Sequence, residues 1–128
     1  MFGFSLSGLD GKSFVDIGVL WSSSMRDKNE LVWIEAISDK WWTNYVEGIR
    51  FQSHYSENIE SFSVNKELAT TDTGTSCTFI PGKYYSVITD KILADGKGYE
   101  WNETYGQYIM PCDNKLPRID LLLGGYWL

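Results

Sequence analysis

The side chain with the clearest chemical potential is Asp72, which opens a glycine turn flanked by hydroxyl groups. It follows the strand-like run of residues 68–71, and residues 72–76 read Asp-Thr-Gly-Thr-Ser. Gly74 allows the backbone to turn tightly and to approach a bound molecule. A carboxylate held in such a loop can accept or donate a proton, which is general acid–base chemistry.

The elements expected around this loop are mostly β-strands, with one helix directly after it. Alternating or apolar runs predict strands over residues 2–6, 13–20, 31–37, 42–51, 68–71, 108–110 and 119–123. Residues 53–66 are polar and are expected to form a loop or a hairpin tip. Apolar residues recur at helical spacing between Pro81 and Gly96, which predicts a helix there.

The order of these segments resembles the C-terminal lobe of the pepsin-like aspartic peptidases. The strongest match is the loop of residues 72–76, which is similar to the family's second catalytic loop. Weaker matches occur in the family's order over residues 2–7, 15–18, 31–34, 41–49 and 112–121. The resemblance implies a mostly β fold over residues 1–128, a bent and partly open barrel-like lobe with one or two short helices.

The chemistry implied by this resemblance is hydrolysis of a peptide or protein substrate without metal, cofactor or covalent intermediate. Two carboxylates about 3 Å apart share one proton, because two negative charges so close cannot both form cheaply. The ionised carboxylate takes a proton from water while the protonated one hydrogen-bonds the scissile carbonyl. The sequence contains one Asp-Thr-Gly loop, so a second carboxylate is needed.

The resemblance also implies a role for each residue of the loop. Asp72 is one half of the catalytic pair, and the Thr75 hydroxyl holds its outer carboxylate oxygen. The Thr73 hydroxyl reaches across to the partner lobe and locks the two loops together. Hydrogen bonds to the backbone of a substrate are expected from Gly74, Thr75 and Ser76.

Several departures from the family predict an incomplete unit. We find no first-lobe catalytic loop and no flap tyrosine region, and the sequence stops at Leu128, before the family's strand beneath the Asp loop. Thr70 and Thr71 stand where the family usually has aliphatic residues. We therefore expect part of a C-terminal lobe that is inactive alone, because one carboxylate cannot act as base and acid together.

Three sources of function remain open at this point. An N-terminal lobe could supply the second carboxylate, or a second copy of the chain could do so as a homodimer. The third is a non-catalytic peptide-binding module. An exposed apolar patch is expected where a facing lobe would dock.

The amino-acid composition and the N-terminal residues indicate which partners and which cellular compartment are compatible with this sequence. A length of 128 residues fits one domain, and the 16% of aromatic residues favour a sheet-rich fold. The net charge of −6 disfavours nucleic acid, and the apolar runs are too short for a membrane span. The family suggests a secreted, lysosomal or vacuolar protein, yet the N-terminus lacks the pattern of a secretory signal.

Other reactive side chains are weaker candidates. His54 is the one histidine and is expected to be solvated, since nothing marks the nucleophile and acid of a Ser–His site. One histidine and two cysteines are too few for a typical metal site. Trp41 and Trp42 are expected in the core or on a binding surface.

The two cysteines are candidates for disulfide bonds, and one asparagine is a candidate for glycosylation. By resemblance, Cys112 pairs with a cysteine outside this chain. A Cys77–Cys112 bridge is the alternative if the two Cα atoms lie within about 7 Å, and Cys77 is otherwise expected to be a buried thiol. Residues 102–104 read Asn-Glu-Thr, a glycosylation sequon that matters if the chain enters the secretory pathway.

Overall fold

The structure is a computed structural model that describes residues 2–6, 11–18, 31–75 and 77–128. The chain forms two compact units, Met1–Trp33 and Ile34–Leu128. In the first unit, β1 (Phe2–Ser5) and β2 (Phe14–Ile17) form an antiparallel hairpin. Both strands were predicted, although residues 19–20 of the second prediction lie outside the described residues.

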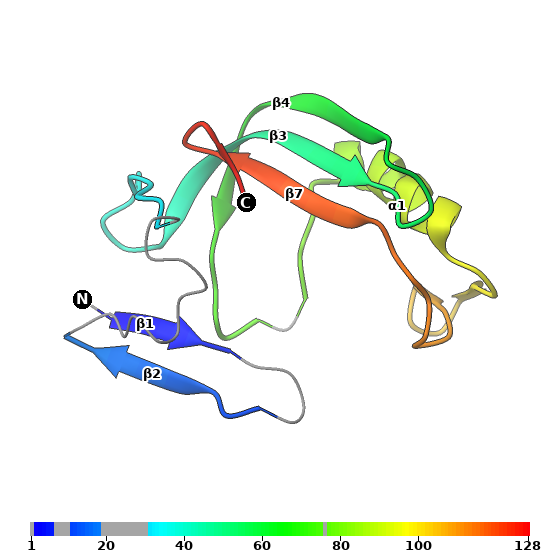
Figure 1. The fold of residues 1–128 in the computed structure, drawn as a ribbon, viewed down its shortest axis with the longest axis horizontal. Helices are drawn as coiled ribbons and strands as arrows, with labels where there is room; N and C mark the ends of the chain where they lie inside the picture. The colour runs from blue at the N-terminus through cyan, green and yellow to red at the C-terminus, as the bar shows by residue number, and fades with distance from the viewer. Residues whose placement is uncertain (1, 7–10, 19–30, 76) are drawn as a thin grey trace. The chain divides into compact units, whose positions relative to one another are not determined.

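The second unit is built on an antiparallel sheet in the order β4-β3-β7-β8 (Figure 1). Its strands are β3 (Thr43–Gln52), β4 (Ile59–Thr70), β7 (Arg118–Leu123) and β8 (Tyr126–Trp127). A separate hairpin joins β5 (Glu100–Asn102) to β6 (Gln107–Ile109), and α1 (Gly82–Asp95) follows the Asp72 loop. Over the described residues the fold is mostly β with one helix, and the sheet does not close into a barrel.

An irregularity in β3 decides which of its side chains reach the core. The register of β3 with both neighbouring strands shifts between Val46 and Gly48. Side chains alternate between the faces of a regular strand, but an extra residue reverses that alternation. Val46 can therefore join Ile49 and Phe51 in one buried cluster.

Position 48 requires glycine because two side chains lie close to its backbone, on the face of the sheet opposite the buried cluster. A Cβ atom at this position would lie 3.0 Å from Cη2 of Trp127 and 3.3 Å from Cβ of Leu122. The indole ring of Trp127, on β8, therefore packs over the backbone of β3 where the register shifts. Figure 1 shows that β3 and β4 both curve along their length.

The core lies between the sheet and α1. Among the described residues, five apolar side chains are buried: Val46, Ile49, Phe51, Val64 and Ile88. The rings of Phe51 and Phe62 stack at 6.0 Å, and Tyr84 of α1 lies 6.3 Å from Phe62. Removing these apolar surfaces from water is the main force that holds the helix on the sheet.

The predicted helix between Pro81 and Gly96 is confirmed. Tyr84, Ile88 and Ile92 pack against the core, whereas Tyr85 is exposed. The helix begins after Pro81 and ends at Gly96, whose N–H donates to Ile92 O over 3.1 Å. Gly96 has an extended conformation with φ of −72°, so it ends the helix without entering the left-handed region.

Two predictions of local structure were wrong. Residues 53–66 are not all loop, since the twelve-residue strand β4 begins at Ile59. The polar side chains at Ser61 and Ser63 alternate with Phe62 and Val64, which face the core or lie close to it. A strand with one face in solvent contains many polar residues, as a loop does. The prediction of a loop rested on this polarity and did not consider that polar and apolar residues alternate.

The strand predicted over residues 31–37 is absent. Its backbone is instead held locally: Ile37 N–H donates to Thr43 O over 2.9 Å, and the Asn44 amide donates to Glu35 O over 2.8 Å. The predicted strands at 42–51, 108–110 and 119–123 correspond to β3, β6 and β7, while β5 and β8 were not predicted. None of the helices in the described part of the chain is long and apolar enough to cross a membrane.

Candidate functional site

The loop that carries Asp72 leaves the end of β4 beside the start of β3. The Thr71 N–H donates to Trp42 O over 2.9 Å, and the hydroxyls of Thr43 and Thr70 lie 2.9 Å apart. Thr43 is buried, so its hydroxyl needs this partner in place of water. These contacts fix the point at which the loop departs from the sheet.

The Asp72 carboxylate accepts a hydrogen bond at each oxygen from its own loop. Oδ1 accepts from the Gly74 N–H over 2.8 Å, and Oδ2 accepts from the Thr75 hydroxyl over 2.5 Å. A Cβ atom at Gly74 would lie 3.2 Å from Oδ1, which explains why glycine suits this position. The loop thus holds the carboxylate in one orientation.

These contacts also set the charge of the loop. The Thr75 hydroxyl, followed by the Gly74 N–H, lowers the pKa of Asp72 below its ordinary value, against a smaller opposing effect of burial. Residues 72–75 are exposed to solvent. An ionised, solvent-facing carboxylate can accept a proton from water, but it has no hydrogen to donate to a carbonyl.

The structure brings together three of the predicted site residues: Asp72, Gly74 and Thr75. The Thr73 side chain makes no hydrogen bond to another described residue, so its reach toward a partner lobe stays a prediction. Ser76 lies outside the described residues. No second carboxylate hydrogen-bonds to Asp72 within the parts of the chain that the structure describes.

A contact that the sequence analysis missed links α1 to the strand that leads into the loop. Glu67 of β4 accepts from the ammonium of Lys83 and, over 3.1 Å, from the Tyr84 hydroxyl. The Lys83 ammonium lowers the pKa of Glu67, and Glu67 in turn raises the pKa of Lys83. The sequence carries no local signal for this contact, because only the packing of α1 brings Glu67 to Lys83 and Tyr84.

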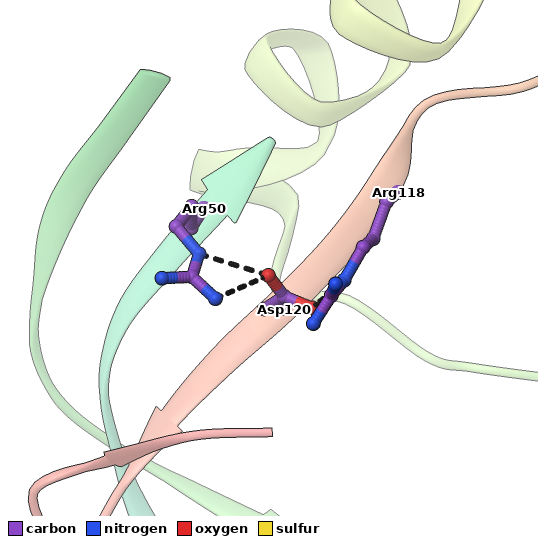
Figure 2. Close-up of polar contacts among 3 residues, drawn as sticks. All are labelled: Arg50, Arg118 and Asp120. Carbon is purple, nitrogen blue, oxygen red and sulfur yellow. Dashed lines mark hydrogen bonds and ion pairs between the residues drawn. The ribbon is translucent and has the colours of Figure 1, made fainter. Parts of the chain in front are cut away.

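A second charged cluster lies on β3 and β7 (Figure 2). Asp120 Oδ2 accepts from Arg50 Nε over 2.8 Å and from a second Arg50 nitrogen over 2.6 Å, while Oδ1 accepts from Arg118 Nε over 2.6 Å. Burial works to raise the pKa of Asp120, but the hydrogen bonds and charges of both arginines lower it. The Arg50 guanidinium also lies 4.7 Å from the centre of the Trp127 ring. Both Asp120 oxygens accept hydrogen bonds from arginines, so the cluster links β3 to β7 and stabilises the sheet.

The remaining candidates are surface groups. The His54 side chain is exposed and meets the Tyr55 ring edge-on at 5.4 Å. Its backbone N–H and the Ser53 hydroxyl each donate to Asp95 over 2.7 Å, which anchors the β3–β4 turn on the end of α1. Trp41 and Trp42 are 68% and 59% exposed, so their placement in the core was wrong.

Both cysteines are exposed free thiols. The expectation of a buried thiol at Cys77 was therefore wrong, and the structure contains no bridge between Cys77 and Cys112. Pairing of Cys112 with a cysteine outside this chain stays a prediction.

Known proteins contain sequences similar to this chain, including the part that carries the Asp72 loop. The sequence pattern of the eukaryotic aspartyl proteases matches residues 1–127, which is nearly the whole chain. The chain belongs to the eukaryotic aspartyl protease family. Penicillopepsin-3 of Penicillium janthinellum is 38% identical to it over 55 residues, which is 43% of this chain and 13% of that protein. No solved structure matches the chain.

Membership of this family agrees with a mostly β, pepsin-like fold. The family match includes the Asp72 loop, both strands that frame it and the helix that follows. The match to penicillopepsin-3 spans about an eighth of the length of that protein.

Proposed function

We propose that this chain supplies one catalytic carboxylate, Asp72, of an aspartic endopeptidase centre. The observation that carries the proposal is the geometry of the Asp72 loop. Both carboxylate oxygens accept hydrogen bonds from Gly74 and Thr75, yet the carboxylate still faces solvent. Membership of the aspartyl protease family supports the same chemistry.

Asp72 takes the part of the ionised partner in this proposal. Its pKa is lowered by the Thr75 and Gly74 hydrogen bonds, so it keeps its negative charge into the acidic range. The carboxylate would accept a proton from the attacking water. A second, protonated carboxylate would hydrogen-bond the scissile carbonyl and later give its proton to the leaving amine.

We further propose that residues 1–128 are part of a C-terminal lobe and that a facing lobe carries the second carboxylate. Phe79, which follows the loop in sequence, is 85% exposed, and Leu68, which precedes it, is 65% exposed. Large apolar side chains on both sides of a polar loop suit a surface that meets another lobe or a bound peptide. Without that lobe, water at Asp72 would exchange freely with solvent, and the isolated chain is expected to be inactive.

Within this proposal, Gly74, Thr75 and Ser76 offer hydrogen bonds to the backbone of a peptide or protein substrate. Thr73 reaches toward the facing loop. Neither role requires a metal ion or a cofactor. The substrate sequence that is cleaved would depend on side chains of both lobes.

The test compares peptide cleavage between pH 3 and 7 by the full product of the reading frame and by residues 1–128 alone. The full product should cleave, and Asp72→Asn should reduce its rate by about 10²–10⁴-fold, the usual contribution of general acid–base catalysis. Asp113→Asn makes the same change at an exposed turn residue and should leave the rate unchanged. Full activity in the Asp72→Asn protein would refute the proposal.

Residues 1–128 alone separate the other sources of function. No turnover by the folded chain is the expected result. Turnover that is second order in protein concentration and lost in Asp72→Asn would instead assign the second carboxylate to another copy of the chain. Peptide binding without turnover that survives Asp72→Asn would identify a non-catalytic binding module.

A further inference from the structure

We propose that Asn102 is a site of N-linked glycosylation at the tip of the β5–β6 hairpin. Asn102 has Thr104 two positions later, with Glu103 between them, which is the acceptor pattern. The other asparagines lack a hydroxyl residue at that position: Asn29, Asn44, Asn58, Asn65 and Asn114. The proposal is independent of catalysis at Asp72.

The turn of the hairpin engages the oxygen atoms of Asn102 and leaves its side-chain nitrogen available. The backbone oxygen of Asn102 accepts from the Gly106 N–H over 2.9 Å, and Oδ1 accepts from the Tyr105 N–H over 3.1 Å. Gly106 has a φ of 60°, the left-handed conformation that this turn needs. Nδ2, the atom that would receive a sugar, donates no hydrogen bond to any described residue.

A sugar on Nδ2 is compatible with the folded hairpin. The amide oxygen remains an acceptor after glycosylation, so the bond from Tyr105 can persist. Residues 103–106 are all exposed, which gives a bulky group room at the tip. Asn102 pairs with Gln107 at the end of the ladder, where no further strand residues follow.

The aromatic side chains of the hairpin lie on the other face of its two strands. Trp101 pairs with Tyr108, and their rings meet at 5.0 Å; Tyr99 meets Tyr108 at 5.8 Å. Successive side chains of a strand point to opposite faces, so Asn102 faces away from Trp101. A glycan can therefore be added without displacing the aromatic contacts. These rings are half-exposed, and a bulky hydrophilic group nearby would oppose association through them.

The donor in this reaction is a lipid-linked oligosaccharide diphosphate. Nδ2 forms a C–N bond with the anomeric carbon of the first sugar while the bond from that carbon to the phosphate oxygen breaks. The lipid diphosphate leaves with the electron pair, and the Nδ2 proton passes to a base of the transferring enzyme. The product is a neutral, bulky group on an exposed turn.

The test expresses the chain behind a cleavable secretion signal in a eukaryotic host and measures its intact mass. The chain should gain one oligosaccharide, which an amidase that cleaves at the glycosylated asparagine removes. Asn102→Gln and Thr104→Ala should abolish the gain, whereas Thr104→Ser keeps the acceptor pattern and should retain it. A secreted chain with no added mass would overturn the proposal.

A second measurement tests the placement of the glycan on the folded hairpin. The near-ultraviolet circular dichroism of the tryptophan and tyrosine rings should be the same in the glycosylated chain and in the Thr104→Ala variant, which lacks the glycan but keeps an unmodified Asn102. A spectrum that differs between these two proteins would contradict the assignment of Asn102 to the face away from Trp101.

Discussion

Replacing Asp120 with asparagine tests whether the ion cluster of Figure 2 stabilises the sheet. The Asp120 side chain is only 7% exposed and holds together Arg50 and Arg118, which come from different strands. Asparagine removes the negative charge and places an N–H₂ group against one of the guanidinium groups. Two cations then lie close together without a counterion, and Arg50 loses at least one charge-assisted hydrogen bond.

The expected loss is about 3 kcal/mol in the free energy of unfolding, the low end of the range for breaking a buried ion pair. The low end applies because the Arg118 side chain is 64% exposed and the Arg50 side chain 24% exposed, so both can regain water. For a domain of this size the loss lowers the midpoint of thermal unfolding by on the order of 10 °C.

Urea unfolding of the wild type and the variant at several pH values measures the effect. The pKa of Asp120 is lowered in the folded state, so its stabilisation is present above the unfolded value of about 3.9 and is lost as the pH falls through the folded value. The difference between the two proteins should be constant from pH 5 to 7 and shrink below about pH 4.

Two other variants control this measurement. Asp113→Asn removes a charge at an exposed turn residue and should change stability by less than about 0.5 kcal/mol. Arg118→Gln removes an exposed partner and should cost about 1 kcal/mol or less. If Asp120→Asn costs no more than Asp113→Asn, or if its cost is unchanged at pH 2, the cluster does not stabilise the sheet as described.

Two further predictions concern the Asp72 loop. Thr75→Val should raise the pKa of Asp72 toward its ordinary value, because its first hydrogen-bond donor is lost; a carboxyl ¹³C titration measures this, and an unchanged titration would contradict the assigned contact. The stability that the lowered pKa confers above about pH 4 should shrink in this variant. Thr70→Val should cost about 1 kcal/mol in urea unfolding, since the buried Thr43 hydroxyl loses its partner, and Thr43→Val in addition should cost little more.

The elements that the sequence predicted correctly are those whose signals lie within a few residues. The helix after Pro81 has apolar residues at helical spacing and a glycine directly after its last residue. The strand from Thr43 to Gln52 is rich in β-branched and aromatic residues. The Asp72 loop was recognisable because its carboxylate, glycine and hydroxyl groups are adjacent in the chain.

The errors arose where pairing partners decide the structure. Residues 31–37 have the composition of a strand, but local hydrogen bonds hold their backbone. The first half of β4 has the composition of a loop, but β3 supplies its partners. Whether a backbone segment becomes a strand depends on a neighbouring strand, which is often distant in sequence.

The sequence by itself determined the family, the mostly β fold, the helix after the loop and the candidate carboxylate at Asp72. Only the tertiary structure decided that the register shift between Val46 and Gly48 places the Val46 side chain in the core. Only it brought Arg50 into contact with Asp120, which lies 70 positions later in the sequence. The reason is physical: local patterns report on backbone preference and on turns between near neighbours. The register of two strands, and hence which side chains face each other, is fixed only when the whole sheet packs.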